Sequence, residues 1–477
     1  MKKVRYAMKN GEKLLKDTIL YAVANFGSSI LAFFMIPLYT YYFTTSEYGL
    51  WDIVVTTSTL LTPFITFELV AAVYRWLIEE KEIDKRKRII TTGLFMILRN
   101  LVMFNILGLI VMLIFKIPFG WQALLFINVS IASSFLQQCA RGLGHNKLFA
   151  SLGIIQTTIT VAFNLFFIFA LELRIEAFFY SSIIASLLVV VFAWKVMSFS
   201  QYITSSAYSS ILTKSLLAYS IPIIPGAASW WIMTMSDRYF ITAFLGIEYN
   251  GIYAVANKIP ALLLMINSVF FLAWKDSAII EFSAKDKDHY YSKVFQYFFR
   301  LMATSVIMLT LITKPVLWLA ISPDFYSSWK YIGILLVAAL FNACALFWSA
   351  GYHGAKRTKV IFITSFVGAL VNVVVNLILI KYIGLYAVVI SSLIAFLAVW
   401  FIRVVASNRY FKITINYQDM GVLLSLITLA NFVPFIFGPL GLLISICIGG
   451  IVFVTYNWKG LRMVYVRFLS VLRAKCG

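Results

Sequence analysis

Long apolar segments, separated by short polar stretches, follow one another along nearly the whole chain. Most of them are about 20 residues long, the length that an α-helix needs to cross the hydrocarbon core of a membrane. The pattern predicts about fourteen spans, with boundaries that are soft by several residues. The predicted ranges are 18–43, 49–74, 89–115, 120–140, 148–171, 177–196, 215–244, 250–274, 294–319, 331–354, 360–380, 385–405, 420–437 and 440–457.

The composition agrees with this pattern. Hydrophobic residues make up 62% of the 477 residues and charged residues only 12%, and the mean hydropathy is +0.90. Such a chain cannot fold as a soluble domain without exposing most of its apolar surface. We therefore expect an all-α polytopic membrane protein with short loops. The first span is too long for a signal-peptide core, so we expect it to stay attached.

The basic residues predict the orientation. The formal net charge is +21, and many of the 40 lysines and arginines lie before Asp17 and between Arg75 and Arg88. Cytoplasmic loops carry an excess of Lys and Arg, so we expect both termini to lie in the cytoplasm. Later residues assigned to that side include Lys356, Arg357, Lys359, Arg403 and Arg409, whereas Lys116, Arg174, Lys314, Lys330 and Lys381 are assigned to the outside.

This distribution also argues against nucleic acid as a partner, because nucleic-acid binding needs one contiguous basic face. The four cysteines show no disulfide or metal-ligand spacing. The three histidines are far apart in the sequence, so neither a metal site nor a His-centred triad is indicated. We expect no catalytic residue, no metal and no cofactor, and a protein that is not an enzyme.

The chain resembles itself at an offset of about 200 to 212 residues. Asn164, followed by a serine pair at Ser181, matches Asn376, followed by a serine pair at Ser391. The first six spans therefore resemble the next six. Six is even, so the two repeats keep the same orientation, a transporter pattern that places the substrate site between them. We expect lobes at 1–200 and 201–412, followed by two more helices and a basic tail at 413–477.

Arg99, Arg238, Lys258 and Arg300 lie inside predicted spans, and Arg75 lies at the end of one; of these, the candidates for a shared cavity are Arg75, Arg99, Arg238 and Lys258. Charges at membrane depth cost several kcal/mol or more on most estimates, roughly 3 by the mildest, so they are usually functional. Arg75 lies near the end of its span, where its side chain either snorkels to the interface or lines a cavity mouth near Glu68. If the four residues face one cavity, it would hold an anion such as a diphosphate.

Three carboxylates in the spans, Asp52, Glu68 and Asp237, are candidates for coupling transport to an ion gradient. Asp237 has a second interpretation, as a group that anchors the end of its helix. It is adjacent to Arg238, so the two side chains point to different faces of the helix and each needs another partner.

Prolines interrupt the seventh and eighth spans. Pro222 and Pro225 predict a bend in the first of these, either in a gating helix or as a static kink, and Pro260 predicts a break shortly after Lys258. A broken helix frees backbone groups for a polar path.

Together, several segments resemble bacterial polysaccharide flippases, lipid-linked oligosaccharide exporters of the multidrug/oligosaccharidyl-lipid/polysaccharide superfamily. The segments are 36–52, 68–75, 221–240, 251–260, 273–275 and 355–359, and the resemblance extends over nearly the whole chain. It implies a V-shaped pair of six-helix lobes that alternates between inward-open and outward-open states. The implied substrate is an undecaprenyl-diphosphate-linked sugar repeat, for polymers such as O-antigen or capsule. The implied location is a bacterial plasma membrane, and the implied partners are membrane lipids, a polysaccharide polymerase and glycosyltransferases. We expect the protein to be a monomer.

Three other functions are alternatives to a polysaccharide flippase. A lipid-linked cell-wall-precursor flippase would share the fold and the basic cavity. A cation-coupled multidrug exporter would need a pocket dominated by carboxylates. A membrane-embedded polysaccharide polymerase or ligase would usually need a large external loop, and the pattern predicts none.

Overall fold

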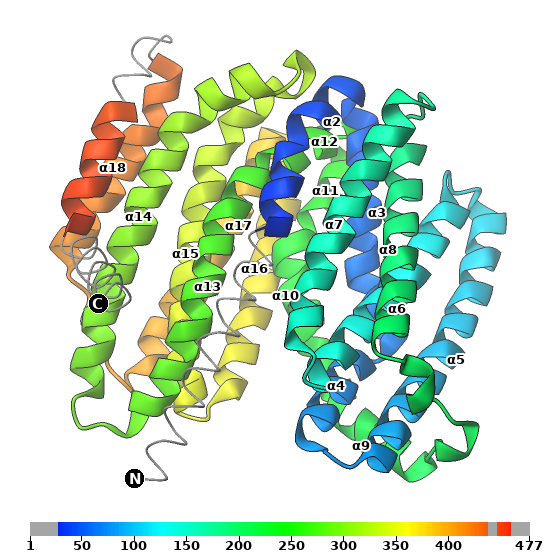
Figure 1. The fold of residues 1–477 in the computed structure, drawn as a ribbon. Coiled ribbons are helices and arrows are strands. Elements are labelled where there is room, and N and C mark those ends of the chain that lie inside the picture. Colours follow the sequence, from blue (N-terminus) through cyan, green and yellow to red (C-terminus); the bar gives the residue numbers. More distant parts are fainter. Residues whose placement is uncertain (1–26, 437–445, 459–477) are drawn as a thin grey trace, which may run out of the picture. The chain divides into compact units, whose positions relative to one another are not determined.

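The computed structural model describes residues 27–436 and 446–458, and every regular element in these ranges is a helix (Figure 1). The predicted all-α class is therefore confirmed. Within these described ranges, eleven helices or joined helices are long and apolar enough to cross a membrane, or up to twelve if one bent pair counts as a single span. These twelve match the predicted spans from 49–74 to 420–437. The other two predicted spans, 18–43 and 440–457, extend outside the described residues.

The chain forms two compact units, Met1–Trp231 and Ile232–Gly477. In the first unit, α2 (Ile36–Tyr42) and α3 (Thr45–Thr66) precede α4 (Leu69–Glu79), α5 (Ile83–Phe115), α6 (Gly120–Gly142), α7 (Asn146–Phe169), α8 (Glu176–Val196) and α9 (Ser210–Ser220). The sequence repeat puts a boundary near residue 200, whereas α9 and the segment before it pack on α4 and α5. Two side chains of α5 hold that segment: Thr91 Oγ1 donates to the Tyr202 carbonyl at 2.9 Å, and the Ser209 amide donates to Thr92 Oγ1 at 3.2 Å.

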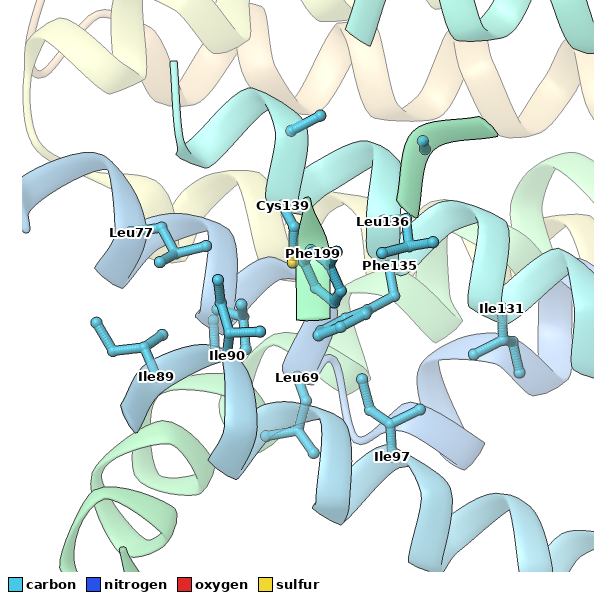
Figure 2. Packing of buried hydrophobic residues seen from close by; sticks show 14 of the residues in the cluster. Leu69, Leu77, Ile89, Ile90, Ile97, Ile131, Phe135, Leu136, Cys139 and Phe199 are labelled. Carbon is cyan, nitrogen blue, oxygen red and sulfur yellow. The ribbon is translucent and has the colours of Figure 1, made fainter. Parts of the chain in front are cut away.

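The core of the first unit forms around the short helix α4. Leu69 and Leu77 are fully buried, and Figure 2 shows them among side chains of α5 and α6. Two glycines allow this close approach: a Cβ on Gly93 would lie 2.4 Å from Val73, and one on Gly142 would lie 2.8 Å from Leu77. Small residues at helix interfaces are the usual means of tight packing within membranes, because apolar burial alone gives little advantage over lipid.

The helices α3 and α4 are one span with a sharp break. They meet at an angle of 62° across Phe67 and Glu68, which have φ values of 49° and 54°. Two successive left-handed residues without glycine are unusual, because a side chain costs roughly 1 to 2 kcal/mol in that conformation. The beginning of α3 is regular: Thr44 and Glu47 form a capping box.

The second unit is built around α15 (Trp329–Gly354), in which 83% of the most apolar stretch is buried. It packs against α13 (Lys258–Ile280) and α17 (Leu385–Ser407), and α17 also packs against α16 (Thr358–Ile383). The short helices α11 (Asp237–Phe244) and α12 (Ile247–Ala256) lie before α13. On the other side, α14 (Lys287–Ala320) lies beside α18 (Tyr417–Ile436), as Figure 1 shows.

Polar contacts attach the last two helices to α14. Arg300 Nε lies 2.6 Å from Asp419 Oδ2 on α18. In the short apolar helix Ile446–Trp458, Asn457 Nδ2 donates to Thr304 Oγ1 at 2.8 Å. Both contacts join α14 to a helix end, since Asp419 lies in the first turn of α18 and Asn457 in the last turn of the short helix.

One residue of the charge count is placed differently by the structure. Arg403 is not a loop residue, since α17 continues to Ser407 and the Arg403 side chain is buried, with 1% exposed. Its guanidinium donates to two neighbouring helices, and all the acceptors are neutral: the Ala345 carbonyl and Ser349 Oγ on α15, and Thr364 Oγ1, Ser365 Oγ and the Ile361 carbonyl on α16. Arg403 therefore links three helices.

Candidate functional site

The carboxylate of Asp237 is buried within the second unit, with 1% of the residue exposed. Asp237 is the first residue of α11, directly after the turn at Ser236 that ends α10 (Ile224–Met235). Oδ2 accepts hydrogen bonds from Tyr253 Oη and Ser392 Oγ, both at 2.7 Å. Oδ1 accepts from Asn376 Nδ2 at 3.0 Å and Asn372 Nδ2 at 3.3 Å. Four hydrogen-bond donors thus compensate for the hydration that the carboxylate loses on burial.

These donors come from three helices. Tyr253 is on α12 and Ser392 is on α17, whereas Asn372 and Asn376 lie one turn apart on the same face of α16. The two amides also contact each other, because Asn376 Nδ2 lies 3.3 Å from Asn372 Oδ1. A single carboxylate therefore holds α11 against α12, α16 and α17.

A cavity of about 80 Å³ lies on one side of this carboxylate. Its polar lining comprises Thr234, Asp237, Tyr253, Asn257, Asn342 and Ser392. Asn342 Oδ1 is buried and has no hydrogen-bond partner in the part of the chain that the structure describes. A polar space of this size can hold a few water molecules that bond to such groups.

The cavity lies where the eighth predicted span is interrupted. The helix α12 ends at Ala256, the chain turns at Asn257, and α13 begins at Lys258. Pro260 lies in the first turn of α13 and lines the cavity. Asn257 Nδ2 donates back to the Tyr253 carbonyl at 2.9 Å, which satisfies one acceptor near the break.

The seventh predicted span is interrupted as well. Pro222 lies in the 3₁₀ turn Ile221–Ile223 between α9 and α10, and Pro225 lies in the first turn of α10. A second interruption at Ser236 separates α10 from α11 and places Asp237 at a helix start. The prolines therefore lie at a break in the span, and a gating role for that break stays a prediction.

Two of the four predicted basic residues belong to the second unit. Arg238 is buried, and its Nη1 lies 3.4 Å from the Thr234 carbonyl. Its guanidinium carbon lies 5.6 Å from the centre of the Tyr253 ring, so Tyr253 contacts the carboxylate with its hydroxyl and the guanidinium with its ring. Lys258 is half-buried at the beginning of α13.

The other two basic residues lie in the first unit. Arg75 is exposed on α4 and forms an ion pair with Glu79, with Nη1 2.6 Å from Oε1. Arg99 is exposed on α5, and its Nη2 lies 3.3 Å from Asn100 Oδ1. Asn100 in turn donates to the Ile65 carbonyl at 2.9 Å, near the break that separates α3 from α4.

The two remaining carboxylates also belong to the first unit. Glu68 is half-buried and forms part of that break, and Asp52 is half-buried on α3. The basic residues are thus divided between the two units, and a single cavity that contains all four stays a prediction. Among the described residues, no group of three or more His, Cys, Asp or Glu could hold a metal ion.

Sequence reasoning singled out Asp237 and Pro260 but missed most of the polar groups around them: Tyr253, Asn342, Asn372 and Ser392. The repeat contained a signal for part of this set, because Asn376 and the serine pair at Ser391 were the best-matched residues of the two halves.

Their counterparts in the first unit form a similar cluster. Asn164 Nδ2 donates to Tyr39 Oη at 2.9 Å, and Ser181 Oγ donates to Asn164 Oδ1 at 3.0 Å. Both units therefore contain an asparagine and serine cluster on the matching pair of helices. In the first unit a tyrosine hydroxyl completes it, and in the second unit a carboxylate does.

The sequence is similar to known proteins over most of its length. A family model described as "Polysaccharide biosynthesis protein" matches residues 14–274. An uncharacterized membrane protein of Methanocaldococcus jannaschii is 23% identical over 433 residues, which cover 84% of this chain and 99% of that protein.

Solved structures with a similar fold belong to transporters. A lipid II flippase MurJ in an inward closed conformation aligns with a TM-score of 0.68 and 15% identity, over 94% of this chain and 100% of that one. An inward-facing MATE family transporter of the MOP superfamily aligns with a TM-score of 0.60 and 14% identity, over 86% of this chain and 95% of that one. A MOP superfamily transporter from Pyrococcus furiosus aligns with a TM-score of 0.53. At these identities the likeness establishes the fold.

Proposed function

Because this chain belongs to the polysaccharide biosynthesis protein family of the MOP exporter superfamily, we propose that it is a flippase for lipid-linked oligosaccharides. It moves polyprenyl-diphosphate-linked repeat units from the inner to the outer leaflet of a bacterial plasma membrane, by alternating access. The likeness to a structure named as a lipid II flippase supports a lipid-linked substrate.

The buried guanidinium of Arg238 is the observation that carries the proposal. A cation at membrane depth is costly, so it usually pairs with another group or marks the path of a substrate or ion. Arg238 is held by the Tyr253 ring and the Thr234 carbonyl, and Lys258 begins the helix that follows the cavity. These two residues bind the diphosphate, with Arg99 and Arg75 as further candidates. No bond is broken during the transfer, so the protein acts as a transporter and needs no catalytic residue.

Asp237 is the coupling carboxylate in this proposal. It is fully buried, it lines a cavity of water size, and its four donors bind three other helices to α11. Protonation would remove the charge that these donors satisfy and would loosen the four-helix contact. Among the described residues, the matching cluster of the first unit has a neutral tyrosine in place of the carboxylate, so we assign this means of coupling to the second unit.

A cation-coupled multidrug exporter is the second candidate, and the likeness to MATE transporters is the observation that favours it. Such an exporter binds a cation and would depend on carboxylates that line its pocket. The two candidates differ in the sign of the charge at the substrate site, so substitution of Arg238 separates them.

The decisive experiment is to locate the lipid-linked oligosaccharide in cells depleted of the protein, with a glycosidase that reaches only external sugar. We expect the lipid-linked units to accumulate in the inner leaflet and to become accessible when the protein is expressed again. Unchanged sidedness with unpolymerised units outside would instead support a polymerase. No accumulation would contradict the flippase proposal and favour the exporter of small cations.

The same assay tests the anion site. Arg238→Ala and Lys258→Ala should each reduce export at least tenfold at unchanged membrane levels, whereas Lys381→Ala should not reduce export. Lys381 is a matched control because it is a lysine near the end of a span in the same unit. Normal export by both Arg238→Ala and Lys258→Ala would remove the assigned anion site.

A further inference from the structure

The second unit has an open apolar groove that the transport proposal does not use. It has a volume of about 560 Å³ and lies among α15, α17 and α18. The lining is mainly hydrophobic and includes Ile334, Val337, Phe341, Leu393, Leu397 and Phe432; Thr428 and Asn431 of α18 add two neutral polar groups. The helix α18 packs along α14, and the groove separates it from α17.

The groove extends over about half of a membrane span. On α15 its lining extends from Lys330 to Phe341, which corresponds to about 16 Å at a rise of 1.5 Å per residue. The hydrocarbon core of a membrane is about 30 Å thick, so the groove matches the depth of one leaflet. Lys330 and Tyr386 lie near the ends of their helices, at the same end of the groove, and the charge count assigns Lys330 to the outer side.

That end of the groove is cationic. Lys330 is exposed, and a smaller hollow next to the groove is lined by both Lys330 and Lys314. Lys314 is held in place there, because its ammonium lies 4.6 Å from the centre of the Trp329 ring and also contacts the Pro434 carbonyl. Among the described residues that line the two hollows, none is acidic.

We propose that this groove binds one phospholipid of the outer leaflet with an anionic headgroup. Its phosphate lies against Lys330, and an acyl chain fills the space between α17 and α18. The occupant is a lipid because the groove is apolar over the depth of one leaflet, and it is anionic because the polar end offers ammonium groups without a competing carboxylate. The bound chain completes the packing between α18 and the rest of the second unit.

Native mass spectrometry of the full chain tests this inference without any transported substrate. The protein is released from nanodiscs that contain phosphatidylglycerol and phosphatidylcholine in equal amounts, and the retained lipids are identified. We expect one retained phosphatidylglycerol in preference to phosphatidylcholine. Lys330→Gln should lower the retention of phosphatidylglycerol about fivefold and leave that of phosphatidylcholine unchanged, since one lysine near a membrane surface contributes about this much.

Two further variants separate the charge from the groove. Leu393→Trp fills the apolar groove and should reduce the retention of both lipids, whereas Lys381→Gln removes a lysine outside the groove and should change neither. Equal retention by wild type and Lys330→Gln, or by wild type and Leu393→Trp, would overturn the inference. Displacement of phosphatidylglycerol by an equimolar polyprenyl phosphate would also overturn it, because the occupant would then be a carrier lipid. These outcomes do not depend on flipping, so they test the lipid site separately from the proposed function.

Discussion

Two buried charges of the second unit, Arg403 and Asp237, are stabilised largely by neutral groups. Arg403 donates to hydroxyls and carbonyls of α15 and α16, and Asp237 accepts from one tyrosine, one serine and two asparagines. Burying an ion is costly unless hydrogen bonds replace its hydration. The hydrogen bonds of both residues therefore depend on the positions of several helices at once. A substitution of either residue should disturb the packing of these helices.

Arg403→Lys tests this dependence. A lysine keeps the charge, but its ammonium has three donors and cannot reproduce the planar fork that reaches α15 and α16 together. We expect the substitution to cost about 2 to 3 kcal/mol, which corresponds to a melting temperature several degrees lower in detergent. Arg409→Lys, at an exposed position shortly after α17, is the matched control and should leave the melting temperature unchanged. A normal melting temperature for Arg403→Lys would contradict the assigned role.

For single residues, the sequence could predict a buried charge only where that charge interrupts an apolar segment. Arg238 and Asp237 do so, and the structure buries both. Arg403 lies near the end of its span, where snorkelling to the interface is an equally good interpretation. Asn342 and Asn372 are uncharged, so nothing in the hydropathy pattern distinguished them from asparagines that merely satisfy each other, such as Asn105 and Asn128.

At the scale of helices, the break between α3 and α4 could not be predicted from the pattern. The predicted span 49–74 continues through Phe67 and Glu68, and neither residue is the glycine that a left-handed conformation favours. Pro63 lies just before the break and removes one donor from the ladder. The predicted break at Pro260 was recognisable because proline and neighbouring polar residues occur together there. The apolar parts of the spans were predicted from hydrophobicity, whereas α5 and α14 begin at Ile83 and Lys287, in polar sequence before the predicted starts at 89 and 294.

Glu68 is both a candidate carboxylate and a strained backbone position, and glycine separates these two roles. Glu68→Gly keeps the left-handed conformation and removes the carboxylate, so we expect a nearly unchanged melting temperature and normal export. Glu68→Ile should cost about 1 to 2 kcal/mol, because a β-branched residue is strongly disfavoured there. Glu79→Ile, on the exposed face of α4, is the control for adding an apolar side chain. Loss of export in a well-folded Glu68→Gly protein would instead assign the coupling role to this carboxylate.

For the whole molecule, the orientation in the membrane follows from the charge count and can be tested by labelling. In a protein from which the native cysteines have been removed, Lys81 or Lys356 is replaced by a single cysteine. The two positions lie in the connections after α4 and α15. Both should react with an impermeant maleimide only when the inner face is open to it. A cysteine at Lys116, at the end of α5, should react from outside. The reverse pattern would overturn the orientation and, with it, the outer-leaflet position of the groove.

The driving force for transport is also a property of the whole molecule, and it has two possible sources in the proposed mechanism. The proposed substrate has a diphosphate with two negative charges, and its outward movement would be favoured by about 2.3 kcal/mol per charge per 100 mV, so the membrane potential alone would favour export. A carboxylate that takes up a proton would add a second source. The substrate's own charges respond to the potential whether or not Asp237 is present, whereas proton coupling in the proposed mechanism requires it.

Proteoliposomes in which the potential and the pH gradient are set independently separate these sources. We expect wild type to respond to both, and Asp237→Asn to respond to the potential while losing its response to the pH gradient. Asparagine is nearly the same size as aspartate, so the contact with α12, α16 and α17 is altered in charge more than in shape. A variant that still responds to the pH gradient would move coupling to Glu68 or Asp52. A wild type that responds only to the potential would leave Asp237 as an anchor for α11, which is the other interpretation that its position at a helix start allowed.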